Sequence, residues 1–441
     1  MRTGSRPLQT TLAGLLLMPL ATLAGNAASP PPQVPAKAAW VASWQASPQP
    51  VWGDGFLFPT GLPASLQDRT VRQVARLSLG GGRLRLVFSN AYGTEPLRLG
   101  SATVARPAAA SGALIPGSLR SLSFGGQPGA TVPPGAFVVS DPVALPLPAL
   151  AAISVSFHLP DATPVRSFHW DGRQTTWLLP GEQTQAMAPS TSDAQSTTAR
   201  PLLSAVQVEN TQAAGAVAVM GDSITDGATA SLDQDHRWPD YLAARLAPHG
   251  VAVVNAGISG ARLLSDGMGA NALARLDRDV LAQPGVRSLV VLLGINDIAW
   301  PGTAFAPDAR RPGLAELSAG LRQLVAQAHG RGVRVVGATL TPFEGALPGT
   351  PLADYYNADK DALRQQFNDW IRHGGAFDAV IDFDAALKDP AHPSRLAAAY
   401  DSGDRLHPGD AGNRAMADAV DLGTLVPGLS ENPARETALR P

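Results

Sequence analysis

Two patterns of apolar positions divide the chain. Between about Trp40 and Asn210, short runs alternate apolar and polar residues and end in Gly/Pro turns, which is typical of strands with one buried face. From Ala214 onward, short and wholly apolar runs alternate with longer segments in which apolar residues recur at helical spacing. We therefore expect a β-rich accessory domain over residues 38–210 and an α/β domain over residues 211–426, with the boundary near Thr211.

The β-rich part contains one strong hairpin pattern. Apolar residues alternate up to Leu79, the glycines 80–82 follow, and alternation resumes at Leu84, so we expect two paired strands joined by a glycine turn. Several short strands with Gly/Pro turns predict a sandwich or jelly-roll-like domain. The other strands are expected at Leu97–Val104, Ala136–Val139, Ile153–Phe157 and Thr175–Leu179.

The second part predicts a parallel sheet covered by helices on both faces, because strands and helices alternate along it. In such sheets, ligands bind beyond the carboxyl ends of the strands, so side chains that directly follow a strand are the candidates for chemistry. The expected strands are 216–220, 251–254, 288–293, 333–340 and 379–383, and the expected helices are 238–246, 273–281, 314–329, 361–371 and 411–420, the last of the chain.

The first 28 residues predict a secretory signal peptide. Arg2 and Arg6 precede the apolar run Leu12–Leu23, and small residues follow it, which is the order of such a signal. A membrane anchor is the alternative, but Pro19 interrupts a run that is short for a membrane span. We expect a secreted or periplasmic protein without stable membrane insertion after cleavage, and a tail over residues 427–441.

Composition limits the chemistry. The chain is 45% hydrophobic and 16% charged and carries a formal charge of −2, so a packed globular protein is expected and a nucleic-acid partner is not. It contains no cysteine, which excludes thiol nucleophiles, thiolate metal sites and iron–sulfur clusters. Hydroxyl, imidazole, carboxylate and amide groups remain, and we expect neither a metal nor an organic cofactor. The oligomeric state stays open.

Three predicted strands are followed by residues suited to acyl transfer. Ser223 comes directly after the first strand of the α/β part, Gly257 after the second and Asn296 after the third. A serine at such a place can act as a nucleophile, while a backbone N–H and a side-chain amide can bind an oxyanion. Taken singly, each has an ordinary structural explanation as a helix cap or a turn residue.

A fourth segment, shortly before the expected last helix, supplies a base. Asp404 lies three residues before His407, close enough to accept a hydrogen bond from its ring and to orient it. The other seven histidines lack a comparable setting and are interpreted as surface or packing residues. Because a serine nucleophile needs a base, an orienting group and oxyanion donors, the four segments together predict more than each does alone.

These segments resemble, in order, the four signature blocks of the SGNH/GDSL hydrolase superfamily. The resemblance rests on Gly221-Asp222-Ser223, Gly257, Gly294-x-Asn296-Asp297 and Asp404-x-x-His407. It implies a three-layer α/β/α, flavodoxin-like domain. It also implies a Ser223–His407–Asp404 triad, with an oxyanion hole made by the N–H groups of Ser223 and Gly257 and by the Asn296 side chain.

Longer sequence segments resemble those of a secreted bacterial subgroup of this superfamily that carries an amino-terminal β domain. They are Ile224-Thr225-Asp226-Gly227, Arg237-Trp238-Pro239 and Ser89-Asn90-Ala91-Tyr92-Gly93. The G-x-S-x-G nucleophile elbow does not occur, which disfavours an α/β-hydrolase lipase.

The resemblance implies a serine esterase, and the leading substrate hypothesis is a short acyl group, such as acetyl, on carbohydrate or a small ester. A lysophospholipase or lipase is the alternative within the same chemistry. A non-catalytic carbohydrate-binding module is the alternative from another class. The tryptophans at 44, 52, 170 and 177 are compatible with sugar contact, although packing in the core or between the domains is the favoured explanation.

Overall fold

The computed structural model describes residues 40–53, 55–108, 112–190 and 192–429. These residues belong to one compact unit, Ala38–Pro441, so the division into domains at about residue 211 stays a prediction. The predicted signal peptide lies outside the described residues, as does most of the predicted tail. In the described part of the chain, no helix has the length and apolar character needed to cross a membrane.

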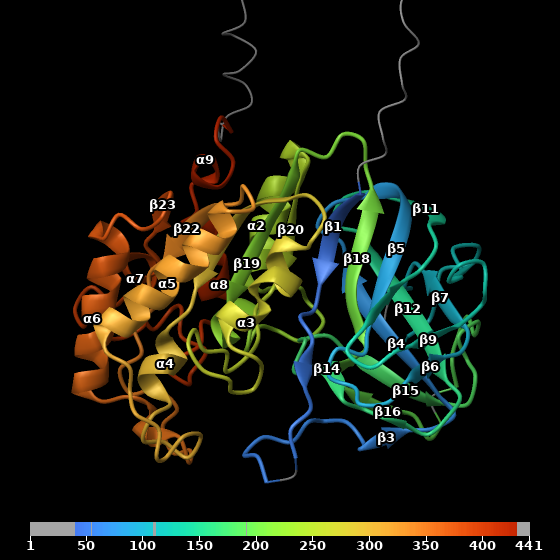
Figure 1. Cartoon of the computed structure of the whole chain (residues 1–441), viewed down its shortest axis with the longest axis horizontal. Coiled ribbons are helices and arrows are strands. Elements are labelled where there is room, and N and C mark those ends of the chain that lie inside the picture. The colour runs from blue at the N-terminus through green and yellow to red at the C-terminus, as the bar shows by residue number, and fades with distance from the viewer. Residues whose placement is uncertain (1–39, 54, 109–111, 191, 430–441) are drawn as a thin grey trace, which may run out of the picture. The chain divides into compact units, whose positions relative to one another are not determined.

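The strand-rich part, coloured blue to green in Figure 1, contains two larger antiparallel sheets among its described residues. Side chains of both sheets share one core, in which the rings of Phe88 and Phe157 lie 5.3 Å apart. The first sheet contains β1 (Trp40–Gln45), β18 (Leu203–Glu209), β5 (Gly81–Ser89), β10 (Phe137–Val139) and β11 (Val143–Leu147). The second contains β16 (Gln195–Thr197), β15 (Thr176–Pro180), β4 (Arg69–Arg76), β12 (Ala152–Leu159), β7 (Ala102–Ala105) and β8 (Arg120–Ser121).

The predicted glycine-turn hairpin is wrong in its pairing. Both strands exist as β4 and β5, but β4 pairs with β12 and β15, whereas β5 pairs with β18, β10 and β11. Residues between them therefore cross from one sheet to the other. A Cβ atom at Gly80 would lie 2.1 Å from the carbonyl oxygen of Leu147, so this glycine permits a close backbone approach rather than a hairpin turn.

Three small antiparallel sheets complete the strand-rich part as far as it is described. One of them, β14 with its neighbours β2 and β17, reaches toward the α/β part and matters for the site below (Figure 1). The strands are β2 (Gln49–Pro50), β14 (Ser167–His169) and β17 (Arg200–Pro201); β3 (Ser65–Leu66) and β13 (Thr163–Pro164); and β6 (Leu97–Leu99) and β9 (Ala130–Val132).

A parallel sheet forms the centre of the second part, as predicted. Its order is β20-β19-β21-β22-β23, and all neighbours are parallel. The chain starts at β19, continues to β20 on one side and then adds the other strands on the opposite side, so the connection reverses between β19 and β21. Ligand crevices form at such a reversal. The strands are β19 (Gly215–Gly221), β20 (Val251–Asn255), β21 (Val286–Leu292), β22 (Arg334–Ala338) and β23 (Ala379–Ile381).

The helices of this part follow the predicted order, with additional short ones. Helix α2 packs on β20 and α8, and α5 packs on β22 and α6. The helix expected to be the last ends at Asp418 and is followed by α9, which corrects the prediction. The helices are α1 (Ser223–Asp226), α2 (Trp238–Leu246), α3 (Ala272–Leu276), α4 (Ile295–Ala299), α5 (Leu314–His329), α6 (Ala358–His373), α7 (Phe383–Leu387), α8 (Asp410–Asp418) and α9 (Leu422–Leu425).

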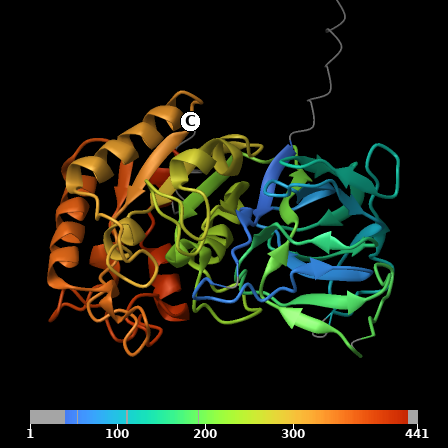
Figure 2. The same cartoon turned by 60° about the horizontal axis from the view of Figure 1, so that its bottom comes forward.

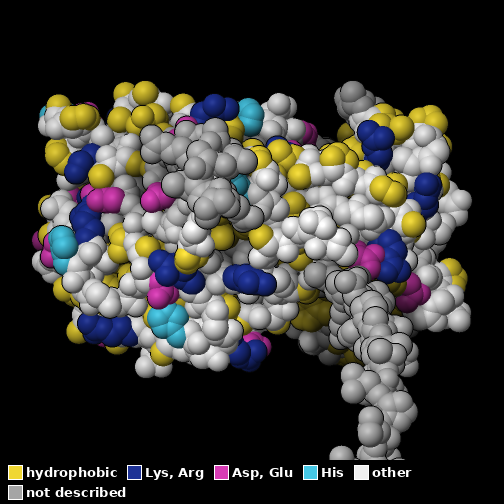
Figure 3. All heavy atoms as spheres, turned by 90° about the horizontal axis from the view of Figure 1, so that it is seen from above, with side chains coloured by type: hydrophobic (Ala, Val, Ile, Leu, Met, Phe, Trp, Pro, Cys, Tyr) yellow, Lys and Arg dark blue, Asp and Glu magenta, His cyan; other side chains and the backbone are white. Residues whose placement is uncertain are grey.

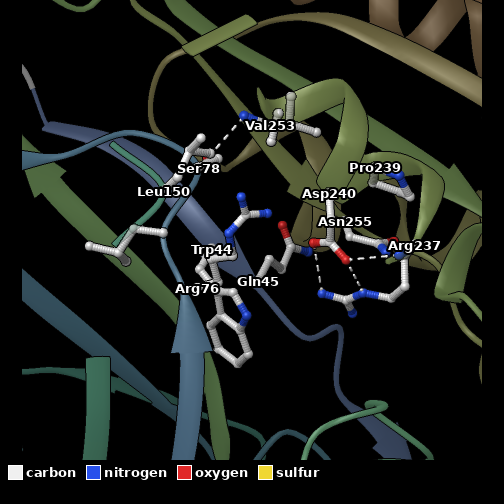
Figure 4. A pocket seen from close by; sticks show the side chains of 12 residues that line it. Trp44, Gln45, Arg76, Ser78, Leu150, Arg237, Pro239, Asp240, Val253 and Asn255 are labelled. Atoms are coloured by element: carbon white, nitrogen blue, oxygen red, sulfur yellow. Dashed lines mark hydrogen bonds and ion pairs between the residues drawn. The ribbon is translucent and has the colours of Figure 1, made fainter. Parts of the chain in front are cut away.

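The strand-rich part and the α/β part meet along β1 and β20 (Figures 1 and 2). The Ala42 N–H donates to the carbonyl oxygen of Pro284 at 2.8 Å. The Ser78 hydroxyl accepts from the Val253 N–H at 3.0 Å, as the close-up in Figure 4 shows. Backbone groups of the two parts are therefore hydrogen-bonded to each other. Over the face seen in Figure 3, basic and acidic side chains are interspersed.

Candidate active site

Ser223 is placed by the tight exit from strand β19. The strand ends at Gly221, and α1 begins at Ser223 with Asp222 as its N-cap, whose side chain accepts the Ile224 N–H at 3.0 Å. A Cβ atom at residue 221 would lie 2.1 Å from Oγ1 of Thr225. Only glycine therefore allows this turn, which presents Ser223 at the carboxyl end of the sheet, as predicted.

His407 connects Ser223 to Asp404. Its Nε2 lies 2.8 Å from Oγ of Ser223, and its Nδ1 lies 2.6 Å from Oδ2 of Asp404. An ionised carboxylate only accepts hydrogen bonds, so Nδ1 carries the proton and Nε2 is left to accept from the serine hydroxyl. The three side chains come from segments up to 184 residues apart, and together they form the arrangement that activates a serine nucleophile.

The carboxylate of Asp404 is held in its ionised form. Burial favours the neutral acid, but hydrogen bonds from the His407 ring and from the N–H groups of Leu406 and His407 outweigh it and lower the pKa to about 2. The two N–H groups bind Oδ1 at 2.9 and 2.8 Å, which leaves Oδ2 for the ring. Each oxygen therefore has a separate role, one in the loop and one in orienting His407.

Asn296 lies at the exit of β21, in the first turn of α4. Its Oδ1 accepts from the Tyr355 hydroxyl at 2.7 Å, and its Nδ2 donates to the carbonyl oxygen of Ala261 at 3.0 Å. These two partners determine which end of the amide is nitrogen, and they leave one N–H of Nδ2 available in the cavity that Asn296 lines. Tyr355 was not singled out from the sequence, because no motif surrounds it.

The prediction for Gly257 is contradicted by the structure. Its N–H donates to Oδ1 of Asn255 at 2.8 Å and is not available to an oxyanion. A Cβ atom at Gly257 would lie 2.5 Å from the backbone nitrogen of Asp226, so this glycine permits the close approach of its loop to α1. The residue that lines the cavity instead is Gly260, with φ of 70°.

Two backbone donors beside the cavity are free. In the described part of the chain, the N–H groups of Ser223 and Gly260 have no hydrogen-bond acceptor. Both residues line the same cavity as Asn296 and His407. Three N–H groups can thus converge on one carbonyl oxygen, which is the requirement for an oxyanion hole.

Two further carboxyl groups behind the site are deeply buried. Burial raises the pKa of Asp222 to about 7, against the hydrogen bond from Ile224. Burial also raises the pKa of Asp297 to about 6, against the N–H groups of Leu263 and Leu264, which bind it at 2.7 and 3.0 Å. The two carboxyls support the turn at Ser223 and the loop that precedes α3. Among the described residues, no group of three His, Asp or Glu side chains could hold a metal ion.

The cavity that opens on Ser223 has a volume of about 410 Å³ and is walled by aromatic rings from both parts of the chain. Phe58 and Trp170, from the strand-rich part, are stacked with ring centres 5.4 Å apart. Trp300 and Phe305, from the α/β part, are stacked at 4.4 Å, and Phe58 meets Phe305 at 5.3 Å. These four rings form the aromatic wall.

The four tryptophans named in the sequence analysis lie in different environments. Trp170 belongs to the aromatic wall, and Trp52 packs against it with ring centres 5.8 Å apart. Trp44 is buried in the core of the strand-rich part, and Trp177 lies in β15, outside the cavity. Packing thus explains Trp44, whereas Trp170 is available to a ligand.

Comparison with known proteins places the second part in a family. Residues 219–415 match the GDSL-like lipase/acylhydrolase family. No curated protein matches the chain. Among solved structures, a lipolytic protein of the G-D-S-L family from Desulfitobacterium hafniense is 19% identical, with 46% of this chain and 97% of that chain covered and a TM-score of 0.34.

The acetylxylan esterase Axe2 from Geobacillus stearothermophilus is another similar structure, with 24% identity, 50% of this chain and 96% of that chain covered, and a TM-score of 0.35. The family match spans the exit of β19, the loop with Gly260, the exit of β21 and the Asp404–His407 loop. Residues 219–415 therefore match the GDSL-like lipase/acylhydrolase family, and this match identifies the chain as a carboxylic ester hydrolase.

Proposed function

We propose that Ser223 is the nucleophile of this esterase, that His407 is its general base, and that Asp404 orients and stabilises the His407 imidazolium. The observation that carries this proposal is the continuous hydrogen-bond chain from Asp404 through His407 to Ser223, which ends in the cavity. Ser223 attacks the ester carbonyl while His407 takes its proton. His407 then protonates the leaving alcohol, and water hydrolyses the acyl-enzyme by the same route.

The oxyanion of each tetrahedral intermediate is bound, in this proposal, by the N–H groups of Ser223 and Gly260 and by Nδ2 of Asn296. Support comes from the unpaired state of the two backbone donors and from the fixed orientation of the Asn296 amide. Gly260 takes the role that the sequence had suggested for Gly257.

Replacing Asn296 with alanine should lower kcat on the order of a hundredfold with little change in KM, because the amide binds charge that develops only in the transition state. Steady-state kinetics with p-nitrophenyl acetate measure this. Tyr355→Phe is the comparison variant: it removes the donor to Oδ1 but keeps Nδ2, so its kcat should fall much less. A kcat for Asn296→Ala within threefold of the unchanged enzyme would remove Asn296 from the oxyanion hole.

For the substrate, we propose a short acyl group, acetyl above all, carried by a carbohydrate or a small alcohol. A cavity of about 410 Å³ is near the small end of ligand sites, which favours a short acyl chain over a long one. The aromatic wall, with the polar side chains of Asp171 and Arg173 beside it, suits a sugar ring, whose faces are apolar and whose edge carries hydroxyls.

Replacing Trp170 with alanine should raise KM for acetylated xylo-oligosaccharides about tenfold, the effect of losing one stacking contact. The kcat for p-nitrophenyl acetate should change much less, since Trp170 does not touch the reacting atoms in this proposal. Trp177→Ala is the matched control, because Trp177 is a partly buried tryptophan of the same part of the chain that does not line the cavity. Equal KM values for Trp170→Ala and the unchanged enzyme on the sugar ester would contradict the carbohydrate proposal.

A lysophospholipase or lipase is the alternative substrate class, and the apolar character of the aromatic wall is the observation in its favour. Rates for acetyl, butyryl and octanoyl esters of p-nitrophenol separate the two, since a lipase should prefer the longest chain. A carbohydrate-binding module without activity would hydrolyse none of them. The amino-terminal sequence further leads us to propose export to the periplasm or the medium.

A further inference from the structure

A buried histidine of the strand-rich part reaches the helix of the nucleophile. His169, at the end of β14, is exposed by only 4% of its side chain, and Asp226, at the end of α1, by 2%. Nε2 of His169 lies 2.9 Å from Oδ1 of Asp226, and Nδ1 lies 3.0 Å from the carbonyl oxygen of Ser47. The sequence alone suggested only a surface or packing role for this histidine.

Asp226 binds the loop of Gly260 with its other oxygen. Oδ2 accepts from both the N–H and the hydroxyl of Ser259, each at 2.9 Å. Ser259 directly precedes Gly260, and Asp226 lies in the same short helix as Ser223. One carboxylate therefore connects the two segments that carry the proposed backbone donors of the oxyanion hole.

The hydrogen bonds also determine that Nδ1 of His169 carries a proton. A carbonyl oxygen only accepts, so Nδ1 donates a proton to Ser47. Both oxygens of Asp226 are hydrogen-bonded, Oδ1 to Nε2 of His169 and Oδ2 to Ser259, so each polar atom of this buried pair has a partner. Loss of either residue would leave polar atoms of the other buried without a partner.

The loop that carries Gly257 and Gly260 is packed tightly against helix α1. The backbone at Gly257 packs so closely on Asp226 that a Cβ atom would overlap it. On the other side, the Gln49 side chain binds both the carbonyl oxygen of Met268 and the N–H of Trp170, at 2.6 and 2.7 Å. The segment from Ser47 to Gln49 is thus clamped between β14 and the loops of the active site.

We propose that His169 is a positioning residue for catalysis: it holds the Asp226 carboxylate so that the Ser259–Gly260 backbone directs its free N–H at the oxyanion. The strand-rich part then completes the catalytic centre and is more than a substrate-binding accessory. This inference rests on the proposed function, because it presumes that Gly260 is an oxyanion donor.

The test compares His169→Ala with His158→Ala. His158 is the matched control, since it forms a pair of the same length, 2.9 Å, with Asp68 on the surface of the strand-rich part. Active sites are titrated with an organophosphate, and kcat and KM for p-nitrophenyl acetate are expressed per labelled site. We expect kcat of His169→Ala to fall at least tenfold with KM within threefold, and His158→Ala to be unchanged. An unchanged kcat per labelled site in His169→Ala would overturn the proposal.

A transition-state analogue gives a readout that a merely structural role would not change. A trifluoromethyl ketone forms an oxyanion with the serine, so its affinity should fall by the same factor as kcat/KM in His169→Ala. If affinity and kcat/KM do not fall together, the loss of activity does not arise in the oxyanion hole and the proposal fails.

If His169→Ala yields no folded protein, the same measurements are made on Ser259→Ala, which removes one of the two donors to Oδ2 of Asp226. A kcat per labelled site equal to that of the unchanged enzyme would then overturn the proposal.

Comparing a conservative variant of Asp226 with its alanine variant distinguishes positioning through hydrogen bonds from a purely structural role. In Asp226→Asn, Oδ1 can accept from Ser259 while Nδ2 donates to a neutral His169, so the connection survives without charge. Its kcat should exceed that of Asp226→Ala at least fivefold, and equal values would contradict positioning through hydrogen bonds. Labelling of the unchanged enzyme keeps the two proposals distinguishable: absent labelling defeats the proposed function, whereas normal labelling with an unaffected His169→Ala defeats only this inference.

Discussion

Replacing Ser223 with alanine is expected to lower the hydrolysis of p-nitrophenyl acetate on the order of a million-fold, to the background left by binding and the oxyanion donors. The reason is chemical: alanine cannot form an acyl-enzyme, and no other hydroxyl lines the cavity at hydrogen-bond distance from His407 among the described residues. Organophosphate labelling should disappear with the activity. Both are measured on the purified variant, with mass spectrometry for the label.

Ser265→Ala is the control for this experiment, because Ser265 is an exposed serine of the same part of the chain and does not line the cavity. It should retain full activity and labelling. Substantial labelling of Ser223→Ala, with the phosphonate attached to another serine, would show that the nucleophile lies elsewhere. Thermal unfolding of both variants should match that of the unchanged enzyme, since the Ser223 hydroxyl bonds to His407 and the hydrogen bonds of α1 to residue 223 use only its backbone carbonyl.

Asp404→Asn is expected to lower kcat on the order of ten-thousand-fold at neutral pH. Oδ1 of residue 404 accepts two backbone N–H groups, so the asparagine oxygen should stay there and its NH₂ should face the His407 ring. An amide donor opposite Nδ1 forces the ring proton onto Nε2. His407 would then present a proton to Ser223 instead of a lone pair, and it could not act as a base.

The matched control is Asp369→Asn, which changes a carboxylate that is paired with His373 at 2.9 Å on the surface. It should leave kcat unchanged. The labelling rate of Asp404→Asn should fall together with kcat, while its KM and its unfolding temperature stay close to those of the unchanged enzyme. A loss of less than tenfold would mean that the ring is oriented by something other than Asp404.

Much of the second part could be predicted from the sequence because its signals are local. Parallel strands buried on both faces appear as short apolar runs, and helices have their own spacing. Helices α2 and α5 begin and end as expected. Ser223, Asn296, Asp404 and His407 could be singled out as candidates, because each directly follows a strand or lies in a short motif, and the structure places all four around one cavity.

Predictions failed where a distant segment decides between two local possibilities. The glycines 80–82 fit a hairpin turn equally well as a crossing between sheets, and the choice depends on the pairing of β5 with β18, a strand more than a hundred residues away. The loop after β20 begins with two closely spaced glycines, Gly257 and Gly260, and both fit a close backbone approach. Only the contact of Gly257 with Asp226 and with Asn255 shows that Gly260 is the one facing the cavity.

By itself, the sequence predicted the α/β sheet, the serine at the exit of β19, and the histidine and aspartate that the structure joins to it by hydrogen bonds. Only the tertiary structure decided what surrounds them. The Tyr355 hydroxyl on Asn296, the aromatic wall with Phe58 and Trp170, and the His169–Asp226 pair all join residues that are far apart in the chain. No periodicity or motif encodes such contacts, because they arise only when the whole core packs and buried polar groups must find partners.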